Sequence, residues 1–189
     1  MRKVVLQMGM GLNGIGSEGW APSVEGSTDF QDLYDDMWNY LKSVDTYLLG
    51  RKCYQLWERV WPPLAKDPSS SGLEKKFSRF TDQIQKVVFS KTLKSVSWAN
   101  STLVTGDLSE EIARMRARKG KDMAIVGGPG IAQTFTRLGL IDEYRLWLHP
   151  TILGYGTSLL GVPPESRSLD LVESRRYRSG VIGLHYKLR

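Results

Sequence analysis

The sequence has one cysteine, two histidines and no long apolar run. Cys53 stands alone, which excludes a disulfide within the chain and a thiolate metal cluster. His149 and His185 are isolated and form no H-E-x-x-H site, so we interpret both as structural and expect no metal. No apolar stretch is long enough to cross a bilayer, and the residues after Met1 do not resemble a cleavable leader. We therefore expect a cytoplasmic protein with no membrane partner.

Length and charge limit the remaining possibilities. At 189 residues and 41% hydrophobic content, residues 1–189 are expected to form a single domain. The net charge of +6 raises the question of nucleic acid, and basic residues gather in segments 114–121 and 175–178. The first segment lacks interleaved aromatic residues and is typical of an amphipathic helix with its charged face in water. We expect no nucleic-acid partner, since a positive field equally suits a doubly phosphorylated cofactor.

Apolar spacing predicts strands that alternate with helices as far as residue 149, followed by strands only. We expect strands over 2–9, 46–49, 86–90, 101–104, 123–126 and 143–149, and helices over 29–43, 51–61, 73–83, 108–119 and 129–138. The second helix is expected to stop at Pro62-Pro63, and Asp107 is expected to cap the fourth. Residues 182–188 alternate strictly, as in a half-buried strand. This order predicts an α/β fold with a mostly parallel sheet and antiparallel C-terminal strands.

Two strand-to-helix turns have the composition of phosphate sites. Gly127-Gly128-Pro129-Gly130-Ile131 places glycines at a strand end, before a helix whose N–H groups and dipole favour an anion. The same arrangement recurs in Leu49-Gly50-Arg51-Lys52-Cys53, now with two cations at the start of the predicted helix. Cations there are repelled by the positive end of the helix dipole, and a bound anion would offset that repulsion. A plain turn is an equal alternative for the first motif. Together the two favour a ligand with separated phosphates, such as NADP.

Other motifs carry weaker signals. Residues 9–14 match the dinucleotide fingerprint G-x-G-x-x-G, but the residues that follow cannot continue a helix. We interpret the segment from Gly9 to Gly19 as a loop of the kind that covers active sites. Asp36 and Tyr40 share one face of a predicted helix, where a carboxylate could hold ring nitrogens or deliver a proton. A solvated acidic face is the alternative.

In combination, these motifs resemble the dihydrofolate-reductase superfamily. The branch they resemble is the reductase domain of the bifunctional riboflavin-pathway deaminase–reductase and its stand-alone relatives. The resemblance lies in Met10-Gly11-Leu12-Asn13-Gly14, in 48–54, in 86–90, in Gly127-Gly128 with 139–144, and in the segment from Pro150 to Gly156. It implies a three-layer dihydrofolate-reductase-like fold, an NADPH-dependent reductase and a homodimer.

The resemblance also implies roles for particular residues. Gly50, Arg51, Lys52 and Cys53 would bind the adenosine-phosphate side of NADPH, with Ser90 and Lys91 beside the adenine. Gly127, Gly128, Pro129, Gly130 and Ile131 would hold the pyrophosphate, and Met8 and Gly9 would line the nicotinamide, with Gly16 as a further cofactor contact. Trp20, Asp36 and Tyr40 would contact the substrate, with Asp36 the catalytic carboxylate.

Two residues depart from the family pattern, because Asn13 replaces the usual Asp and Cys53 the usual Thr. The deaminase zinc motifs H-x-E and P-C-x-x-C are missing as well, so the chain carries the reductase part alone. The leading hypothesis is hydride transfer from NADPH to a ribosylaminopyrimidine- or dihydropterin-like substrate. A nucleotide-binding protein without turnover is the second, and nucleic-acid binding through residues 114–121, which would be steeply salt-dependent, is the third.

Overall fold

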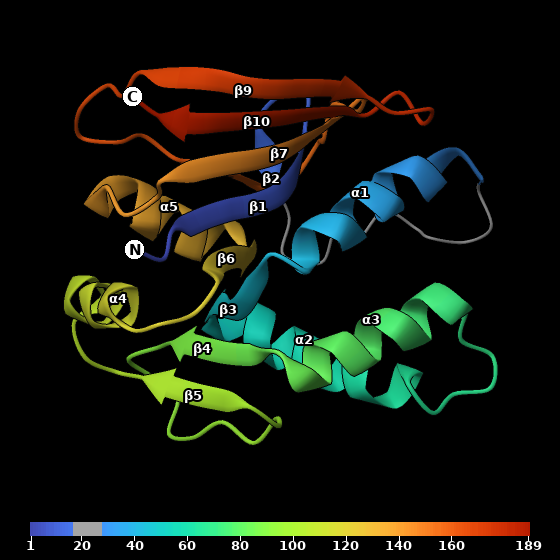
Figure 1. Ribbon diagram of the computed structural model, residues 1–189, viewed down its shortest axis with the longest axis horizontal. Coiled ribbons are helices and arrows are strands. Elements are labelled where there is room, and N and C mark those ends of the chain that lie inside the picture. Colours follow the sequence, from blue (N-terminus) through green and yellow to red (C-terminus); the bar gives the residue numbers. More distant parts are fainter. Residues whose placement is uncertain (17–27) are drawn as a thin grey trace.

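An eight-stranded sheet in the order β5-β4-β3-β6-β1-β7-β10-β9 forms the centre of the molecule. The computed structural model describes residues 1–16 and 28–189 (Figure 1). The strands of this sheet are β1 (Val4–Gly11), β3 (Val44–Gly50), β4 (Gln85–Phe89), β5 (Ser101–Val104), β6 (Asp122–Gly127), β7 (Glu143–His149), β9 (Leu169–Arg176) and β10 (Ile182–Leu188). The short strands β2 (Ile15–Gly16) and β8 (Thr157–Ser158) pair with each other beside it.

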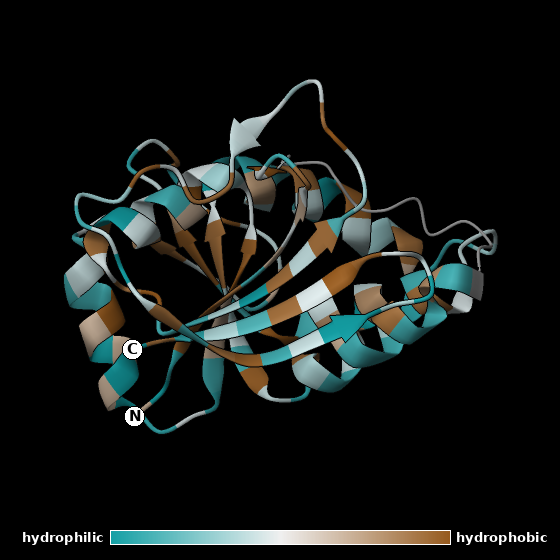
Figure 2. Cartoon of the chain, turned by 90° about the horizontal axis from the view of Figure 1, so that it is seen from above, coloured by the Kyte–Doolittle hydropathy of each residue, from teal (hydrophilic) through white to brown (hydrophobic). Residues whose placement is uncertain are grey.

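The strand directions confirm the predicted fold class. The six strands β1, β3, β4, β5, β6 and β7 run parallel to one another. β10 is antiparallel to both of its neighbours, β7 and β9. The parallel strands are buried on both faces: Leu48 and Ile125 lie in the core cluster on one face, Leu49 and Ala124 in the cluster on the other, and none of the four is exposed. Figure 2 shows these central strands mainly in the hydrophobic colour.

Helices cover both faces of the sheet and complete a three-layer arrangement. They are η1 (Thr28–Phe30), α1 (Gln31–Leu41), α2 (Arg51–Leu64), α3 (Gly72–Gln83), α4 (Leu108–Ala117) and α5 (Pro129–Leu138). α4 and α5 supply Ile112 and Phe135 to one core cluster. The helices α1 and α2 supply Leu41 and Tyr54 to the other, where the aromatic rings of α3 also pack. None of these helices is both long and apolar enough to span a membrane.

Local sequence signals fix most helix ends. Ser71 and Glu74 form a reciprocal capping box at the start of α3. Asp107 accepts a hydrogen bond from the Glu110 N–H, which confirms it as the N-cap of α4. Gly139 ends α5 in the left-handed conformation, with φ of 69°.

One predicted helix end is wrong. The second helix does not stop before the prolines, because α2 continues through Pro62 and Pro63 to Leu64. Proline has a helical φ, and its cost inside a helix is a lost N–H bond and a clash between its ring and the carbonyl four residues earlier. Here both prolines lie in the last turn, so few helical residues follow them. The preceding carbonyl group, that of Trp61, accepts a hydrogen bond from the Ser78 hydroxyl of α3 at 2.6 Å. This bond ties the two helices together at that point.

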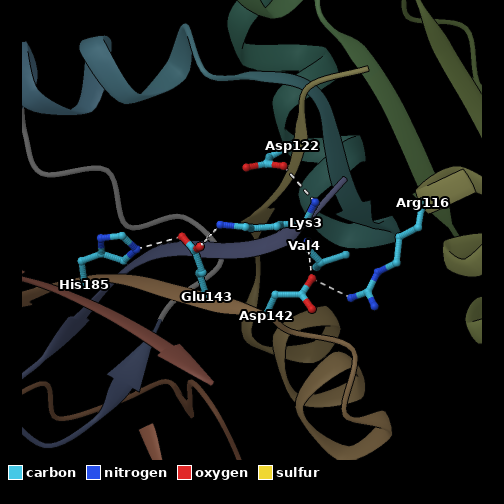
Figure 3. Close-up of polar contacts among 7 residues, drawn as sticks. All are labelled: Lys3, Val4, Arg116, Asp122, Asp142, Glu143 and His185. Carbon is cyan, nitrogen blue, oxygen red and sulfur yellow. Dashed lines mark hydrogen bonds and ion pairs between the residues drawn. The ribbon is translucent and has the colours of Figure 1, made fainter. Parts of the chain in front are cut away.

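A polar cluster fastens the start of β1 to the start of β7 (Figure 3). The Glu143 carboxylate lies between the Lys3 ammonium group, at 2.5 Å, and the His185 ring, at 2.8 Å. Burial alone would raise the pKa of Glu143, but the hydrogen bonds from Lys3 and His185 outweigh it and lower that pKa. The Asp142 carboxylate accepts from the Val4 N–H at 2.7 Å. The family-like segment 139–144, which contains Asp142 and Glu143, therefore has a structural role here. It lies at the end of the sheet where the parallel strands begin.

The same cluster corrects the interpretation of one residue of the basic segment 114–121. Arg116 does not lie on a solvated face, because its guanidinium group turns inward and pairs with Asp142 at 2.7 Å. It also donates to the Leu140 carbonyl at 2.8 Å. Lys121 is held by the Lys42 carbonyl and through its own N–H by Asp45. The other four basic residues of the segment, Arg114, Arg118, Lys119 and Lys121, are exposed, as expected for a solvated face.

Candidate functional site

The carboxyl ends of β3, β4 and β6 border a cavity of about 680 Å³. Parallel α/β sheets bind ligands at this end of their strands, and the volume is in the usual range of small-molecule sites. The cavity brings together ten residues that the sequence assigned to a cofactor, namely Gly50, Arg51, Lys52, Cys53, Ser90, Lys91, Gly127, Gly128, Gly130 and Ile131. The two phosphate-type motifs therefore open into one space.

Two helix N-termini border this cavity, and neither is capped by a side chain of residues 1–16 or 28–189. The N-cap residues are Gly50 for α2 and Gly128 for α5, and neither helix has a capping side chain or an acidic residue in its first turn. The first turn of α5 thus offers its N–H groups to an anion, and the positive end of the α2 dipole adds to the attraction. Arg51 and Lys52 add two exposed positive charges, and Lys91 adds a third at the end of β4. The cavity has the electrostatics of a polyphosphate site.

The three glycines of the β6–α5 turn each lack a side chain for a different physical reason. A Cβ atom on Gly127 would overlap the Sγ atom of Cys53, so strand and helix can approach closely only with glycine there. Gly128 has a φ of 76°, a conformation that favours glycine. A Cβ atom on Gly130 would meet nothing within 4 Å. Its missing side chain therefore leaves cavity space free, rather than relieving a clash within the protein.

The structure adds cavity residues that the sequence reasoning did not identify. They are Phe89, Val104, Thr105, Gly106, Asp107, Leu108, Thr134 and Leu138. Five of them form the turn from β5 into α4, which lies beside the end of β4 because β4 and β5 are paired. The signal available in the sequence was the predicted strand 101–104 before a capped helix, but its pairing with β4 is decided by the fold.

Four predicted cofactor residues do not line this cavity. Met8 is buried in the core cluster on the α4–α5 face, and Gly9 pairs with Trp147 in the sheet. Gly16 lies beside the start of α5, where a Cβ atom would be 3.4 Å from Pro129 Cγ. Pro129 itself is buried as the first residue of that helix. The predicted substrate contact Trp20 lies outside the described residues.

Asp36 and Tyr40 line a second, smaller pocket of about 30 Å³, between α1 and the strands β7, β10 and β9. This volume is enough for one or two water molecules. Asp36 accepts from the Tyr177 hydroxyl at 2.5 Å and contacts the Arg175 guanidinium at 3.5 Å. Tyr40 stacks against the guanidinium of Arg145 at 4.4 Å, and burial raises the pKa of its hydroxyl. The two predicted residues therefore share a site.

Strand register relates the pocket to the cavity. Leu6 of β1 pairs with Ile125, two residues before Gly127, and Gly9 of β1 pairs with Trp147, which lines the pocket. The cavity and the pocket thus lie at a similar level of the sheet, with β1 between them. Neighbouring strands are about 4.8 Å apart, so β6 and β7 are separated by about 10 Å. An extended ligand can span that distance.

The loop after β1 is fastened to the segment after β7. Asn13 donates from Nδ2 to the Leu153 carbonyl at 2.9 Å and accepts from the Leu153 N–H at 3.3 Å. Leu12 donates to the Thr151 carbonyl at 2.7 Å. An Asp at position 13 could accept but not donate. The departure from the family loop therefore has a structural use, as a two-way bond to the backbone.

The fingerprint at residues 9–14 opens no helix. Gly9 and Gly11 belong to β1, Gly14 forms a turn with φ of 73°, and β2 follows directly. The prediction that no Rossmann-type helix follows these glycines is confirmed as far as residue 16. The predicted loop is wrong for most of the described part, because β1 continues to Gly11 and β2 covers Ile15–Gly16, which leaves only residues 12–14 as a turn.

Comparison with known proteins gives this architecture a family. The model of the RibD C-terminal domain matches residues 2–183. The chain belongs to the RibD C-terminal domain family. YyaP of Bacillus subtilis (strain 168), an uncharacterized protein, is 30% identical over 187 residues, covering 98% of this chain and 94% of YyaP. The family that the sequence motifs resemble is thereby confirmed.

Solved structures place this RibD C-terminal domain chain among dihydrofolate-reductase-like folds. A pyrimidine reductase-like protein from Corynebacterium diphtheriae matches with a TM-score of 0.66 and 16% identity, over 100% of this chain and 92% of that one. Dihydrofolate reductase from Enterococcus faecalis, complexed with NADP(H) and RAB-propyl, matches with a TM-score of 0.59 and 12% identity, over 99% and 96%. At these identities the two likenesses concern the fold alone.

Proposed function

We propose that this protein is an NADPH-dependent reductase that transfers hydride to a small heterocycle of the ribosylaminopyrimidine or pteridine kind. The observation that carries the proposal is the cavity between the uncapped N-termini of α2 and α5, with Arg51 and Lys52 at its border. Two anion-binding helix ends in one space suit a dinucleotide, which carries a pyrophosphate and, in NADPH, a separate 2′-phosphate.

The residues present fit such a cofactor. The backbone N–H groups that follow Gly128 would hold the pyrophosphate, and the open space beside Gly130 admits its oxygens. Arg51 would pair with the 2′-phosphate, since a guanidinium group matches phosphate geometry. The bound cofactor would supply the hydride, while the protein supplies orientation and excludes water.

The pocket of about 30 Å³ is too small for a whole heterocycle, so we assign to it only the contact between one polar group of the substrate and Asp36. Its carboxylate is held by Tyr177 and Arg175 and accepts hydrogen bonds, so it suits substrates that present N–H groups. A proton has to reach the reduced atom as well, and Asp36 or an ordered water next to it would deliver that proton. Asp36→Asn tests this role, because the amide keeps the shape but cannot exchange a proton as a carboxylate does. The expected result is a lower rate of turnover with unchanged affinity for NADPH.

Cofactor binding is tested by following tryptophan fluorescence during titration with NADPH and, separately, NADH. The chain contains six tryptophans, which makes energy transfer to a reduced nicotinamide easy to detect. We expect NADPH to bind more tightly, and Arg51→Ala to weaken NADPH by about tenfold or more while changing NADH little. Arg59→Ala is the matched control, because Arg59 is a cation of the same helix that does not line the cavity.

The outcomes separate the hypotheses. Binding of neither cofactor would reject the reductase. Binding of NADPH without its oxidation, in the presence of a ribosylaminopyrimidine or of dihydrofolate, would favour a nucleotide-binding protein without turnover. Oxidation of NADPH by one of these compounds would establish the activity and the substrate class together. It is measured as the loss of absorbance of the reduced nicotinamide.

A further inference from the structure

The connection between β4 and β5 has no helix, although these two strands are parallel neighbours. Parallel strands are usually joined by a crossover that contains one. Here residues 90–100 form no helix or strand. The connection begins at the carboxyl end of β4, where Ser90 and Lys91 line the cavity, and it returns to Ser101 at the start of β5. Its path therefore shapes one wall of the cavity.

Tyr54 of α2 holds the returning part of this connection. Tyr54 is buried, with 1% of its surface exposed. The hydroxyl oxygen accepts from the N–H groups of Ser97, at 3.0 Å, and of Trp98, at 2.9 Å. The hydroxyl group itself donates to the Glu58 carboxylate at 2.7 Å. One donor and two acceptor positions are thereby in use, which is all that a hydroxyl group offers.

Glu58 fixes the direction of the Tyr54 hydroxyl. It lies one turn further along α2, and its Oε1 atom also accepts from the Ser97 hydroxyl at 2.6 Å. Because the Tyr54 proton points to Glu58, the lone pairs of the oxygen are left for the backbone of the connection. Burial and, after it, the hydrogen bond to Glu58 raise the pKa of Tyr54, so the hydroxyl stays protonated at neutral pH.

The anchor and two of the anion-binding residues belong to the same helix. α2 begins with Arg51 and Lys52 at the border of the cavity, and Tyr54 follows within its first turn. Lys91, a further exposed cation of the cavity, lies at the start of the connection that Tyr54 holds. The bonds of Tyr54 thus join the helix that supplies two of the cations to the segment that supplies another.

We propose that Tyr54 is a positioning residue for the cofactor, because it keeps Lys91 beside the phosphate site that begins with Arg51. The inference rests on the proposed function and adds to it a residue that does not line the cavity. In Tyr54→Phe the ring still fills its place, but the N–H groups of Ser97 and Trp98 lose their acceptor. Since an unpaired buried N–H group is costly, the connection is expected to move towards water and to take Lys91 with it.

A double-mutant cycle on the affinity for NADPH tests this role, with dissociation constants from tryptophan fluorescence. Tyr54→Phe and Lys91→Ala are each expected to raise the dissociation constant about fivefold. The double variant should bind about as tightly as either single variant, because Lys91 contributes little once it is no longer held. Gly130→Ala lies in another helix, and its effect is expected to add in full to that of Tyr54→Phe.

Two further variants serve as controls. Tyr34→Phe removes a buried hydroxyl group that has no hydrogen-bond partner among the described residues, from a helix outside the cavity, and should bind NADPH like the wild type. Glu58→Gln keeps an oxygen that accepts from Tyr54, so this conservative change should also preserve the affinity. Thermal melts check that each variant is folded at the temperature of the titrations.

Hydrogen exchange of the free protein distinguishes the ways in which the proposal can fail. The amides of Ser97 and Trp98 are expected to exchange faster in Tyr54→Phe than in the wild type, and unchanged rates would show that Tyr54 does not hold the connection. Wild-type affinity for NADPH despite faster exchange would overturn the positioning role, as would effects of Tyr54→Phe and Lys91→Ala that add in full. A wild-type chain that binds neither NADPH nor NADH would instead reject the proposed function, and the role of Tyr54 with it.

Discussion

Tyr177 and Asp36 are 141 positions apart in the sequence and joined by a hydrogen bond of 2.5 Å. Tyr177 is 2% exposed, and its hydroxyl donates to the carboxylate on α1. Burial and, after it, the hydrogen bond to Asp36 raise the pKa of Tyr177, so the hydroxyl remains a donor throughout the physiological range. The bond joins the turn between β9 and β10 to the helix on the sheet face, and it fixes one oxygen of the proposed catalytic carboxylate.

We predict that Gly183→Ala displaces this tyrosine. A Cβ atom at Gly183 would lie 2.9 Å from Cε2 and 3.0 Å from the hydroxyl oxygen of Tyr177, which is closer than van der Waals contact. We expect a loss of about 1–3 kcal/mol in the free energy of unfolding, measured by urea denaturation. Gly72→Ala is the control, because a Cβ atom there meets nothing within 4 Å. Equal stability of the two variants would contradict the packing described here.

The two outer glycines of the β6–α5 turn are predicted to differ. Gly130→Ala adds a methyl group in open space on a helix, so stability should be kept or slightly increased. Affinity for NADPH should fall, by about tenfold, because the methyl group takes up room beside the proposed pyrophosphate site. Gly127→Ala should instead lower stability, since its methyl group overlaps Cys53. Thermal melts and fluorescence titrations of both variants would show whether stability and affinity separate in this way.

Stability is predicted to fall in mild acid because of His149. Its side chain is 5% exposed, and burial lowers the pKa of His149 to about 4, from an ordinary value of 6.5. Between those values the unfolded chain binds the proton and the native state does not. The native state is therefore favoured above pH 6.5 and loses stability as the pH falls towards 4, by about 2 kcal/mol between pH 7.5 and pH 5.

This prediction is checked by urea denaturation of wild type and His149→Gln at both pH values. Because other groups titrate in the same range, the comparison between the two chains isolates the histidine. The variant should lose less stability than wild type on acidification. Equal losses of stability on acidification in the wild type and the variant would show that His149 does not resist protonation.

The bond between Asn13 and Leu153 leads to a further prediction. In Asn13→Asp the side chain can no longer donate to the Leu153 carbonyl, and a negative charge comes to lie beside that oxygen. We expect a cost of about 1 kcal/mol in the free energy of unfolding. Asn39→Asp is the control, because Asn39 only accepts, from Lys42, and an aspartate can do the same. Similar stabilities of the two variants would mean that the loop does not depend on the donated bond.

The helices and strands and the cavity at the strand ends follow largely from the sequence. Asp107, Pro129 and Gly139 mark helix ends by chemistry that acts within a few residues, so these ends were predictable. The motifs around Gly50 and Gly127 each follow a strand, and the strands of a parallel sheet end at one edge. Their meeting in one cavity could therefore be expected before any tertiary contact was known.

Other contacts depend on which distant segments lie together. Nothing near Arg116 in the sequence shows that it turns inward, since its partner Asp142 is 26 positions away, immediately before β7. The continuation of α2 past Pro62 depends equally on the packing of α3 against it.

The sequence by itself determined the alternation of strands and helices, the helix caps and the two phosphate-type turns, because short-range sterics and hydrogen bonding set all of these. Only the tertiary structure decided that Asp36 is held by Tyr177, that Gly183 makes room for that ring, and that β9 lies at one edge of the sheet. These features depend on strand order and register, which arise from packing between residues far apart in the chain.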